Sequence, residues 1–231
     1  MATGEKPDLP DHLGHRRRLR ERFMLGGGAA LADYELLEIV LFQAIPRQDT
    51  KPIAKALLKR FGSYAGVLHA DAGELGQVKG VGQSAVVALK SVAEAAIRLA
   101  REEVMDRPVL SSWAKLISYL RSAMAHNKTE AFHVLFLDAK NTLIADERQQ
   151  TGTVNHTPMY PREVMKRALE LHATAVIMVH NHPSGDPTPS KTDIKMTHEL
   201  RDIGESLGIR LHDHVIVARS GHSSFKEMGL L

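Results

Sequence analysis

Five consecutive apolar residues at 175–179, Ala-Val-Ile-Met-Val, place the strongest constraint on how this chain can fold. Such a run is typical of a strand buried on both faces, and that strand needs a sheet with helices packed on either side. Strand-like and helical patterns alternate around it. Helices are expected at 113–125, 161–172 and 191–207, and strands at 133–137, from 142, and at 209–218. The sequence therefore predicts an α/β domain whose mixed sheet is flanked by helices.

The first hundred residues have a different pattern, because helical stretches follow one another with only short breaks at Gly or Pro. Helices are expected at 32–42 and 52–60. In a third, longer helix apolar residues recur at steps of four and three, which predicts one buried stripe. The stripe consists of Ala85, Leu89, Val92, Ala96 and Leu99.

These patterns divide the chain into four parts. Residues 1–14 are expected to be a flexible N-terminus, and residues 15–100 a small all-α domain. Residues 101–110 are charged and contain a proline near their end, so we expect a linker there. The α/β domain is expected to occupy residues 111–231.

The composition excludes several classes of protein. The chain has no cysteine, which excludes disulfides, thiol nucleophiles and thiolate metal sites, and also the zinc nucleobase deaminases that need cysteine ligands. Any metal must be held by His, Asp or Glu. The net charge is only +3, so nucleic-acid binding would depend on local features. Because the sequence has no apolar run of about 18–20 residues and no N-terminal signal core, we expect a cytoplasmic protein without a membrane partner.

Metal ligands are suggested at the end of the buried strand, where ligands collect in α/β sheets. His180 and His182 have i, i+2 spacing, which puts both side chains on one side of an extended segment. Asp193 follows eleven residues later, in the first turn of the next helix. Two histidines and a carboxylate leave a fourth position open for water, as in catalytic zinc sites. A simpler interpretation stays open, because Ser190 and Asp193 also match a helix-capping box and His-Asn-His-Pro could be a polar turn.

Residues 180–193 read His-Asn-His-Pro-Ser-Gly-Asp-Pro-Thr-Pro-Ser-Lys-Thr-Asp and match the H-x-H-x7-S-x2-D signature of the JAMM (JAB/MPN) metalloproteases. With this signature, the segments 152–156 and 160–164 and a Gly-Val-Gly turn at 80–82, the chain resembles the RadC family over nearly its whole length. The resemblance implies a JAB/MPN domain with a cytidine-deaminase-like fold, preceded by a helix-hairpin-helix-like domain.

The resemblance also implies roles for individual residues. His180, His182 and Asp193 would hold one Zn²⁺ per chain. Ser190 would orient a water molecule or stabilise the oxyanion of a tetrahedral intermediate. Glu130, just before the first strand, would be the general base that moves a proton from the water to the leaving amine.

Several other residues compete for roles in this site. Glu147 and Glu163 are rival candidates for the base, although Glu163 is also explained by a position in the first turn of a helix. His212 and His214 form a second H-x-H pair on a later strand, where we expect them to share a face. They could form a second metal site or support the first. His156 could border the cleft, or be an ordinary surface histidine.

The N-terminal module carries a weaker indication of nucleic-acid binding. Gly80 and Gly82 lie in a turn between two helices, where glycine lets the backbone approach a phosphate closely. Arg16, Arg17 and Arg18 lie in the one dense basic cluster of the sequence and are candidate phosphate contacts. The alternative is a simple interhelical turn that serves packing or protein contacts.

Three functions are compatible with these features. The first is a zinc-dependent metallopeptidase or isopeptidase that acts on a protein or peptide, with Glu130 as general base. The second is a DNA-repair or recombination accessory protein that binds DNA through its N-terminal module and has a structural or weakly active metal site. A metal-dependent nuclease is the third, but the HNH nuclease motif extends over a longer hairpin than His180-Asn181-His182. Neither the substrate nor the oligomeric state is specified by these patterns.

Overall fold

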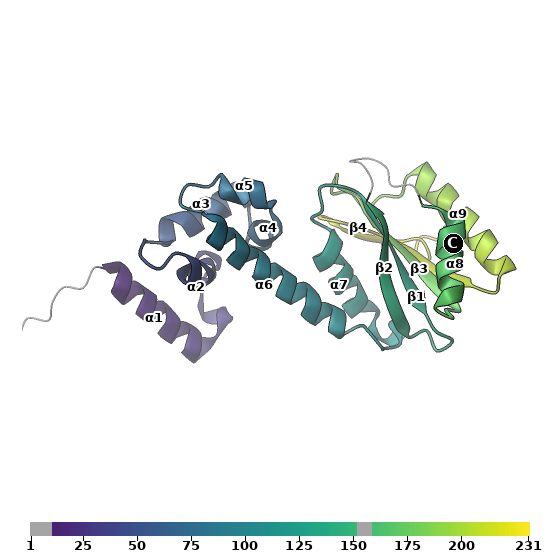
Figure 1. Ribbon diagram of the computed structural model, residues 1–231, viewed down its shortest axis with the longest axis horizontal. Coiled ribbons are helices and arrows are strands. Elements are labelled where there is room, and N and C mark those ends of the chain that lie inside the picture. The colour runs from purple at the N-terminus through teal and green to yellow at the C-terminus, as the bar shows by residue number, and fades with distance from the viewer. Residues whose placement is uncertain (1–10, 152–158) are drawn as a thin grey trace, which may run out of the picture. The chain divides into compact units, whose positions relative to one another are not determined.

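The computed structural model describes residues 11–151 and 159–231 (Figure 1). Contacts divide the chain into two compact units, of which the first ends at Ala95 and the second begins at Ala96. Of the expected flexible N-terminus, residues 1–10 lie outside the described residues, and the first helix begins at Asp11. None of the helices formed by the described residues combines the length and apolar character needed to span a bilayer.

The first unit is all-helical, as the sequence predicted. Its elements are α1 (Asp11–Gly26), η1 (Gly28–Ala30), α2 (Asp33–Ala44), α3 (Lys51–Phe61), α4 (Tyr64–His69), α5 (Ala72–Gly76) and the start of α6 (Gln83–Glu102). Local signals set their ends: Pro52 lies in the first turn of α3, and Gly62, with a φ of 85°, ends it. Leu37, Leu57 and Leu89 are among the residues that meet in one hydrophobic core.

The buried stripe of α6 differs from the expected one in its second half. Ala85 and Leu89 are buried as expected, but the next buried position is Ala93, four residues on. Leu99 is 65% exposed, and Ala96 is exposed as well. Ile97 instead packs against the core of the second unit. Val92 is partly buried and packs against the core of the first unit, so the expected stripe was wrong only from Ala96 on.

Residues 101–110 differ from the expected linker, because much of this segment packs within the second unit. Its first residues end α6, and Val104 and Val109 are buried in the core of that unit. Backbone hydrogen bonds also attach the segment to the sheet: the Asp106 N–H donates to the Leu143 carbonyl, and the Val109 N–H donates to the Asn141 carbonyl. Charged residues concealed this packing in the sequence, since five of the ten residues at 101–110 are Arg, Glu or Asp and the apolar ones form only two short pairs, Val104-Met105 and Val109-Leu110.

The second unit contains the predicted mixed sheet. Its strands are β1 (Ala131–Leu137), β2 (Leu143–Thr151), β3 (Ala175–Asn181), β4 (Arg210–Ala218) and β5 (Gly221–Ser224), in the order β2-β1-β3-β4-β5. β3 and β4 are parallel, and the other neighbouring pairs are antiparallel. The sequence did not predict β5, whose four residues Gly-His-Ser-Ser carry no strand-like apolar pattern.

Helices cover both faces of this sheet, which is why every residue of β3 is buried. After the short η2 (Val109–Ser112), α7 (Trp113–Met124) packs on one face against side chains such as Leu135 and Ile177. α8 (Pro161–Glu170) and α9 (Lys191–Ser206) belong to the opposite face, where α8 and α9 side chains share a core with Phe132 and Met178 (Figure 1). The α/β fold inferred from the apolar run is confirmed.

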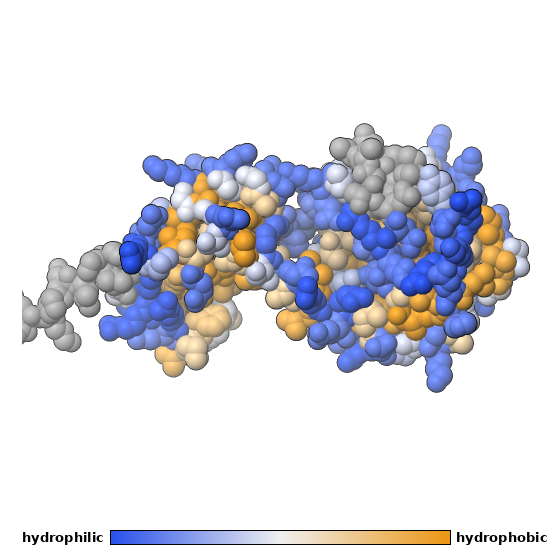
Figure 2. Space-filling view, in the orientation of Figure 1, coloured by the Kyte–Doolittle hydropathy of each residue, from blue (hydrophilic) through white to orange (hydrophobic). Residues whose placement is uncertain are grey.

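The helices on that second face also carry exposed apolar side chains. Leu169 at the end of α8 is 53% exposed, and Leu207 just after α9 is 47% exposed. Figure 2 shows hydrophobic residues at the edge of the second unit where α8 and α9 lie, beside a largely hydrophilic surface. Scattered exposed leucines are normal on a folded protein and do not by themselves indicate a binding site.

Candidate metal centre

His180 and His182 converge at the end of β3. His180 is 1% exposed and lies opposite Phe132 of β1, with the two rings stacked at a centroid distance of 6.1 Å. The alternation of side chains along the strand brings His182 to the same face, where its Nε2 lies 3.0 Å from Nε2 of His180. The i, i+2 spacing therefore does bring the two imidazoles together.

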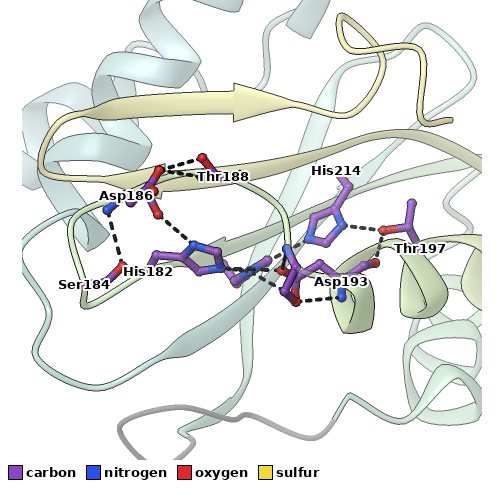
Figure 3. Close-up of polar contacts among 9 residues, drawn as sticks. His182, Ser184, Asp186, Thr188, Asp193, Thr197 and His214 are labelled. Atoms are coloured by element: carbon purple, nitrogen blue, oxygen red, sulfur yellow. Dashed lines mark hydrogen bonds and ion pairs between the residues drawn. The ribbon is translucent and has the colours of Figure 1, made fainter.

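Asp193 completes a group of three candidate ligands. Its Oδ1 lies 3.5 Å from Nε2 of His180, and its Oδ2 lies 3.5 Å from Nε2 of His182 (Figure 3). One ligand atom from each of the three residues lies within 4.8 Å of the others. The capping box expected as the simpler alternative is also present, because the Ser190 N–H donates to Oδ2 of Asp193 and the Asp193 N–H donates to Oγ of Ser190. The helix cap thus orients the carboxylate toward both histidines.

The residues fit a tetrahedral zinc ion. Zinc–ligand bonds of about 2.0–2.1 Å at tetrahedral angles place neighbouring ligand atoms about 3.3 Å apart. The Nε2 atoms of His180 and His182 lie 3.0 Å apart, and the carboxylate of Asp193 turns a different oxygen toward each of them, at 3.5 Å in both cases. The donor set of two imidazoles and one carboxylate is that of catalytic zinc sites, in which one position stays open. The site can therefore hold a metal ion, and its donors suit zinc.

Electrostatics favour unprotonated ligands on two of the three residues. Burial lowers the pKa of His180 to about 4. Burial opposes ionisation of Asp193, but hydrogen bonds from His182 and Ser190 and the charge of His180 bring its pKa below the usual value. The hydrogen bond to Asp193 raises the pKa of His182, so protons compete with a metal mainly at this residue.

Glu130 lies beside the site. The antiparallel register pairs Phe132 with His180, and continuing it by two residues places Glu130 opposite His182, on the same face of the sheet. The charge of Glu130 also raises the pKa of His182, as expected for a nearby carboxylate. Its assignment as general base stays a prediction, which this placement favours.

Asn181, between the two histidines, was missed in the sequence and holds the backbone around Glu130. Its buried side chain points away from the histidine ligands, as a residue between them on a strand must. Its Oδ1 accepts from the Ala131 N–H at 2.8 Å, and its Nδ2 donates to the Thr129 carbonyl at 3.2 Å. The residues on both sides of Glu130 are thus bonded to β3. The signal available in the sequence was an asparagine between the two histidines of an H-x-H pair at the end of an apolar run.

The two rival glutamates are held elsewhere. Glu147 forms a bidentate ion pair with Arg167, whose Nη2 lies 2.6 Å from Oε1. Glu163 lies in the first turn of α8 and pairs with the neighbouring Arg162.

Ser190 caps α9 by accepting a hydrogen bond at its hydroxyl oxygen. The hydroxyl proton is not used in this cap, so Ser190 can still donate a hydrogen bond to a substrate.

The second H-x-H pair does not share a face, so that expectation was wrong. β4 contains a bulge, because Val176 pairs with Leu211 whereas the next residue, Ile177, pairs with Asp213. His212 is the extra residue. It lines a cavity beside Trp113 of α7, whereas His214 lies on the opposite face and contacts His180. The two histidines therefore cannot bind one metal. His156 lies outside the described residues.

Part of the basic cluster of α1 forms contacts within the first unit. Arg16 is only 7% exposed, stacks on Phe42, and donates to the carbonyls of Ile45, Pro46 and Gln48. The expectation that Arg16 contacts phosphate was therefore wrong, because its guanidinium holds the chain just after α2. Arg17 and Arg18 remain exposed, Arg17 with an ion pair to Glu21. DNA binding through this module stays a prediction.

The structural role of Arg16 leads to a measurable expectation. Arg16→Ala removes three hydrogen bonds from a charged donor and should lower the stability of the first unit by about 3 kcal/mol. Amide hydrogen exchange of α1 and α2 in the full chain measures this loss. Arg18→Ala is the matched control, since an exposed substitution should change stability by less than about 0.5 kcal/mol. Equal effects of the two variants would contradict the assignment.

The Gly-Val-Gly turn has a packing role. Gly80 has a φ of 91°, and a Cβ at this position would lie 2.7 Å from Cδ1 of Ile53. The positive φ therefore favours glycine, and the turn also packs closely against the side chain of Ile53 in α3. Gly82 precedes α6, and its carbonyl accepts from the Ala85 and Val86 N–H groups. These contacts agree with the interhelical-turn alternative and leave phosphate binding untested.

Comparison with known proteins gives matches over both units. Residues 110–230 match the RadC-like JAB domain family, and residues 11–87 match the UPF0758 N-terminal family. A UPF0758 protein of Ruegeria pomeroyi is 58% identical over 224 residues, covering 96% of this chain and 100% of the relative. A UPF0758 protein of Rhodobacter capsulatus is 59% identical over 213 residues, covering 92% of this chain and 100% of the relative.

Proposed function

Since the chain belongs to the RadC family, as its sequence suggested, we propose that it is a zinc-dependent metallopeptidase or isopeptidase of the JAMM type. One observation carries the proposal: the Nε2 atoms of His180 and His182 lie 3.0 Å apart, and one ligand atom from each of His180, His182 and Asp193 lies within 4.8 Å of the others, close enough for a single zinc ion to bind all three. The placement of Glu130 opposite His182 adds a carboxylate where a general base is needed.

The chemistry proposed for the site is hydrolysis of an amide bond. A bound Zn²⁺ supplies a Lewis acid and lowers the pKa of water toward about 7. Glu130 takes a proton from the attacking water as its oxygen bonds to the amide carbon, and gives that proton to the nitrogen as the carbon–nitrogen bond breaks. The Ser190 hydroxyl donates a hydrogen bond to the oxyanion of the tetrahedral intermediate. The products are a carboxylic acid and an amine.

Cleavage of synthetic substrates tests this function. The zinc-loaded full chain is incubated with a library of linear peptides and with a matched set in which a peptide is attached to a lysine side chain. We expect cleavage in at least one set, and His182→Ala should abolish it. The set that is cleaved distinguishes a peptidase from an isopeptidase. Equal cleavage by the wild type and His182→Ala would contradict the proposed site.

A further inference from the structure

His214 of β4 lies directly behind the candidate metal ligands. Its side chain is completely buried, with Nε2 2.9 Å from Nδ1 of His180 and Nδ1 2.6 Å from Oγ1 of Thr197. Thr197 lies one turn after Asp193 in α9, and its hydroxyl also lies 2.6 Å from the backbone carbonyl of Asp193 (Figure 3). The three residues connect β3, β4 and α9.

The directions of these hydrogen bonds follow from the donors that are available. A carbonyl oxygen can only accept, so the Thr197 hydroxyl donates its one proton to the Asp193 carbonyl. The same hydroxyl must then accept from His214, which places the proton of His214 on Nδ1. A neutral imidazole protonated at Nδ1 has a lone pair at Nε2, and this lone pair accepts from the Nδ1–H of His180.

The chain of bonds ends on a ligand lone pair. With its proton on Nδ1, His180 presents an unprotonated Nε2 to His182 and Asp193. His182 is held in the same way, because its Nδ1 lies 2.8 Å from the backbone carbonyl of Asp186, which can only accept. The Nε2 lone pair of His180 therefore faces Nε2 of His182 at 3.0 Å, where a cation, either a proton on His182 or a metal ion, would be stabilised.

We propose that His214 and Thr197 are positioning residues that hold His180 in the Nδ1–H tautomer and so keep its Nε2 ready to bind the metal. Neither residue touches the metal or the substrate. The series begins at the backbone of Asp193, so one ligand helps to set the proton position of another. This inference rests on the proposed zinc site and deepens it.

Nuclear magnetic resonance of the full-length, metal-free chain, labelled with ¹⁵N at histidine, reads the tautomers directly. We expect both His180 and His214 to carry their proton on Nδ1. In the opposite series, Thr197 would donate to His214 instead of the Asp193 carbonyl, and both histidines would carry the proton on Nε2. Observation of Nε2–H for His180 would overturn the proposal, whether or not the protein cleaves peptides.

Zinc affinity provides a second readout, measured by competition with a chromophoric chelator. His214→Phe removes the acceptor for His180 and should weaken zinc binding by about 10–100-fold. Thr197→Val keeps the shape of the side chain but loses the hydroxyl, and should weaken binding by about 10-fold. Thr197→Ser restores the hydroxyl and should stay close to the wild type. If His214→Phe fails to fold, the two Thr197 variants decide the matter.

The results separate this inference from the proposed function. Unchanged zinc affinity in Thr197→Val, or an equal loss in Thr197→Val and Thr197→Ser, would overturn the positioning role while leaving hydrolysis intact. A wild type that shows the Nδ1–H tautomer and binds zinc but cleaves neither substrate set would instead overturn the proposed hydrolysis alone.

Discussion

Replacement of Glu130 by Gln should lower kcat for amide hydrolysis by about 10²–10⁴-fold while the protein still binds zinc, because the amide keeps the shape of the side chain but cannot accept a proton. The register of β1 and β3, continued by two residues, puts Glu130 opposite His182, and Glu130 is not one of the three candidate ligands, so the metal ligands themselves are unchanged. Single-turnover kinetics with a cleavable peptide, together with zinc content, measure both parts of this expectation.

The rival glutamates provide matched controls for that experiment. Glu147→Gln disrupts the ion pair with Arg167, and Glu163→Gln disrupts the pair with Arg162. Neither variant should reduce kcat by more than a few-fold, since each carboxylate is engaged by an arginine. A Glu130→Gln protein that cleaves as fast as the wild type, or a Glu147→Gln protein that loses activity instead, would show that the base has been assigned to the wrong residue.

The second large effect concerns stability. Zinc at about 1,000 times its Kd should stabilise the wild type by about 4 kcal/mol, because the metal binds the folded site. For proteins of about 150–250 residues, such a gain corresponds to a rise in Tm of about 8–16 °C. His182→Ala removes one of three ligands and should show almost none of this rise. Differential scanning calorimetry with and without zinc measures the difference.

A histidine outside the site is the control for the thermal experiment. His212 lines a different cavity beside Trp113 and has no role in the proposed metal site. His212→Ala should therefore retain the full zinc-dependent rise in Tm. If His212→Ala loses the rise while His182→Ala keeps it, zinc binds at His212 and the assigned ligand set is wrong.

The sequence predicted the fold well where burial leaves a periodic pattern. The apolar run at 175–179 required a covered sheet, and β3 is buried along its whole length. The prediction failed where contacts between distant segments decide burial. In α6 the buried positions change after Val92, since Ile97 packs in the core of the second unit in place of Ala96 and Leu99. Val104 and Val109 join that core although charged neighbours suggested a linker.

In the candidate site, too, local features were predictable from the sequence and contacts between distant segments were not. Spacing suggested His180, His182 and Asp193 and the family signature selected them, and the structure brings them together through strand alternation and a helix cap, which are local features. His214 lies on the face of His180 because β4 contains a bulge with one extra residue. No pattern in the sequence predicted this bulge. Arg16 looked like part of a basic surface, and only the folded chain shows that it bonds to the carbonyls after α2.

A zinc-loaded crystal measured at the zinc absorption edge tests the central claim most directly, because anomalous scattering locates the metal without reference to activity. The account predicts one zinc ion per chain, about 2.0–2.2 Å from Nε2 of His180, Nε2 of His182 and one carboxylate oxygen of Asp193, with a fourth position open to water. A zinc ion bound through other residues, or an empty site at saturating zinc, would contradict it.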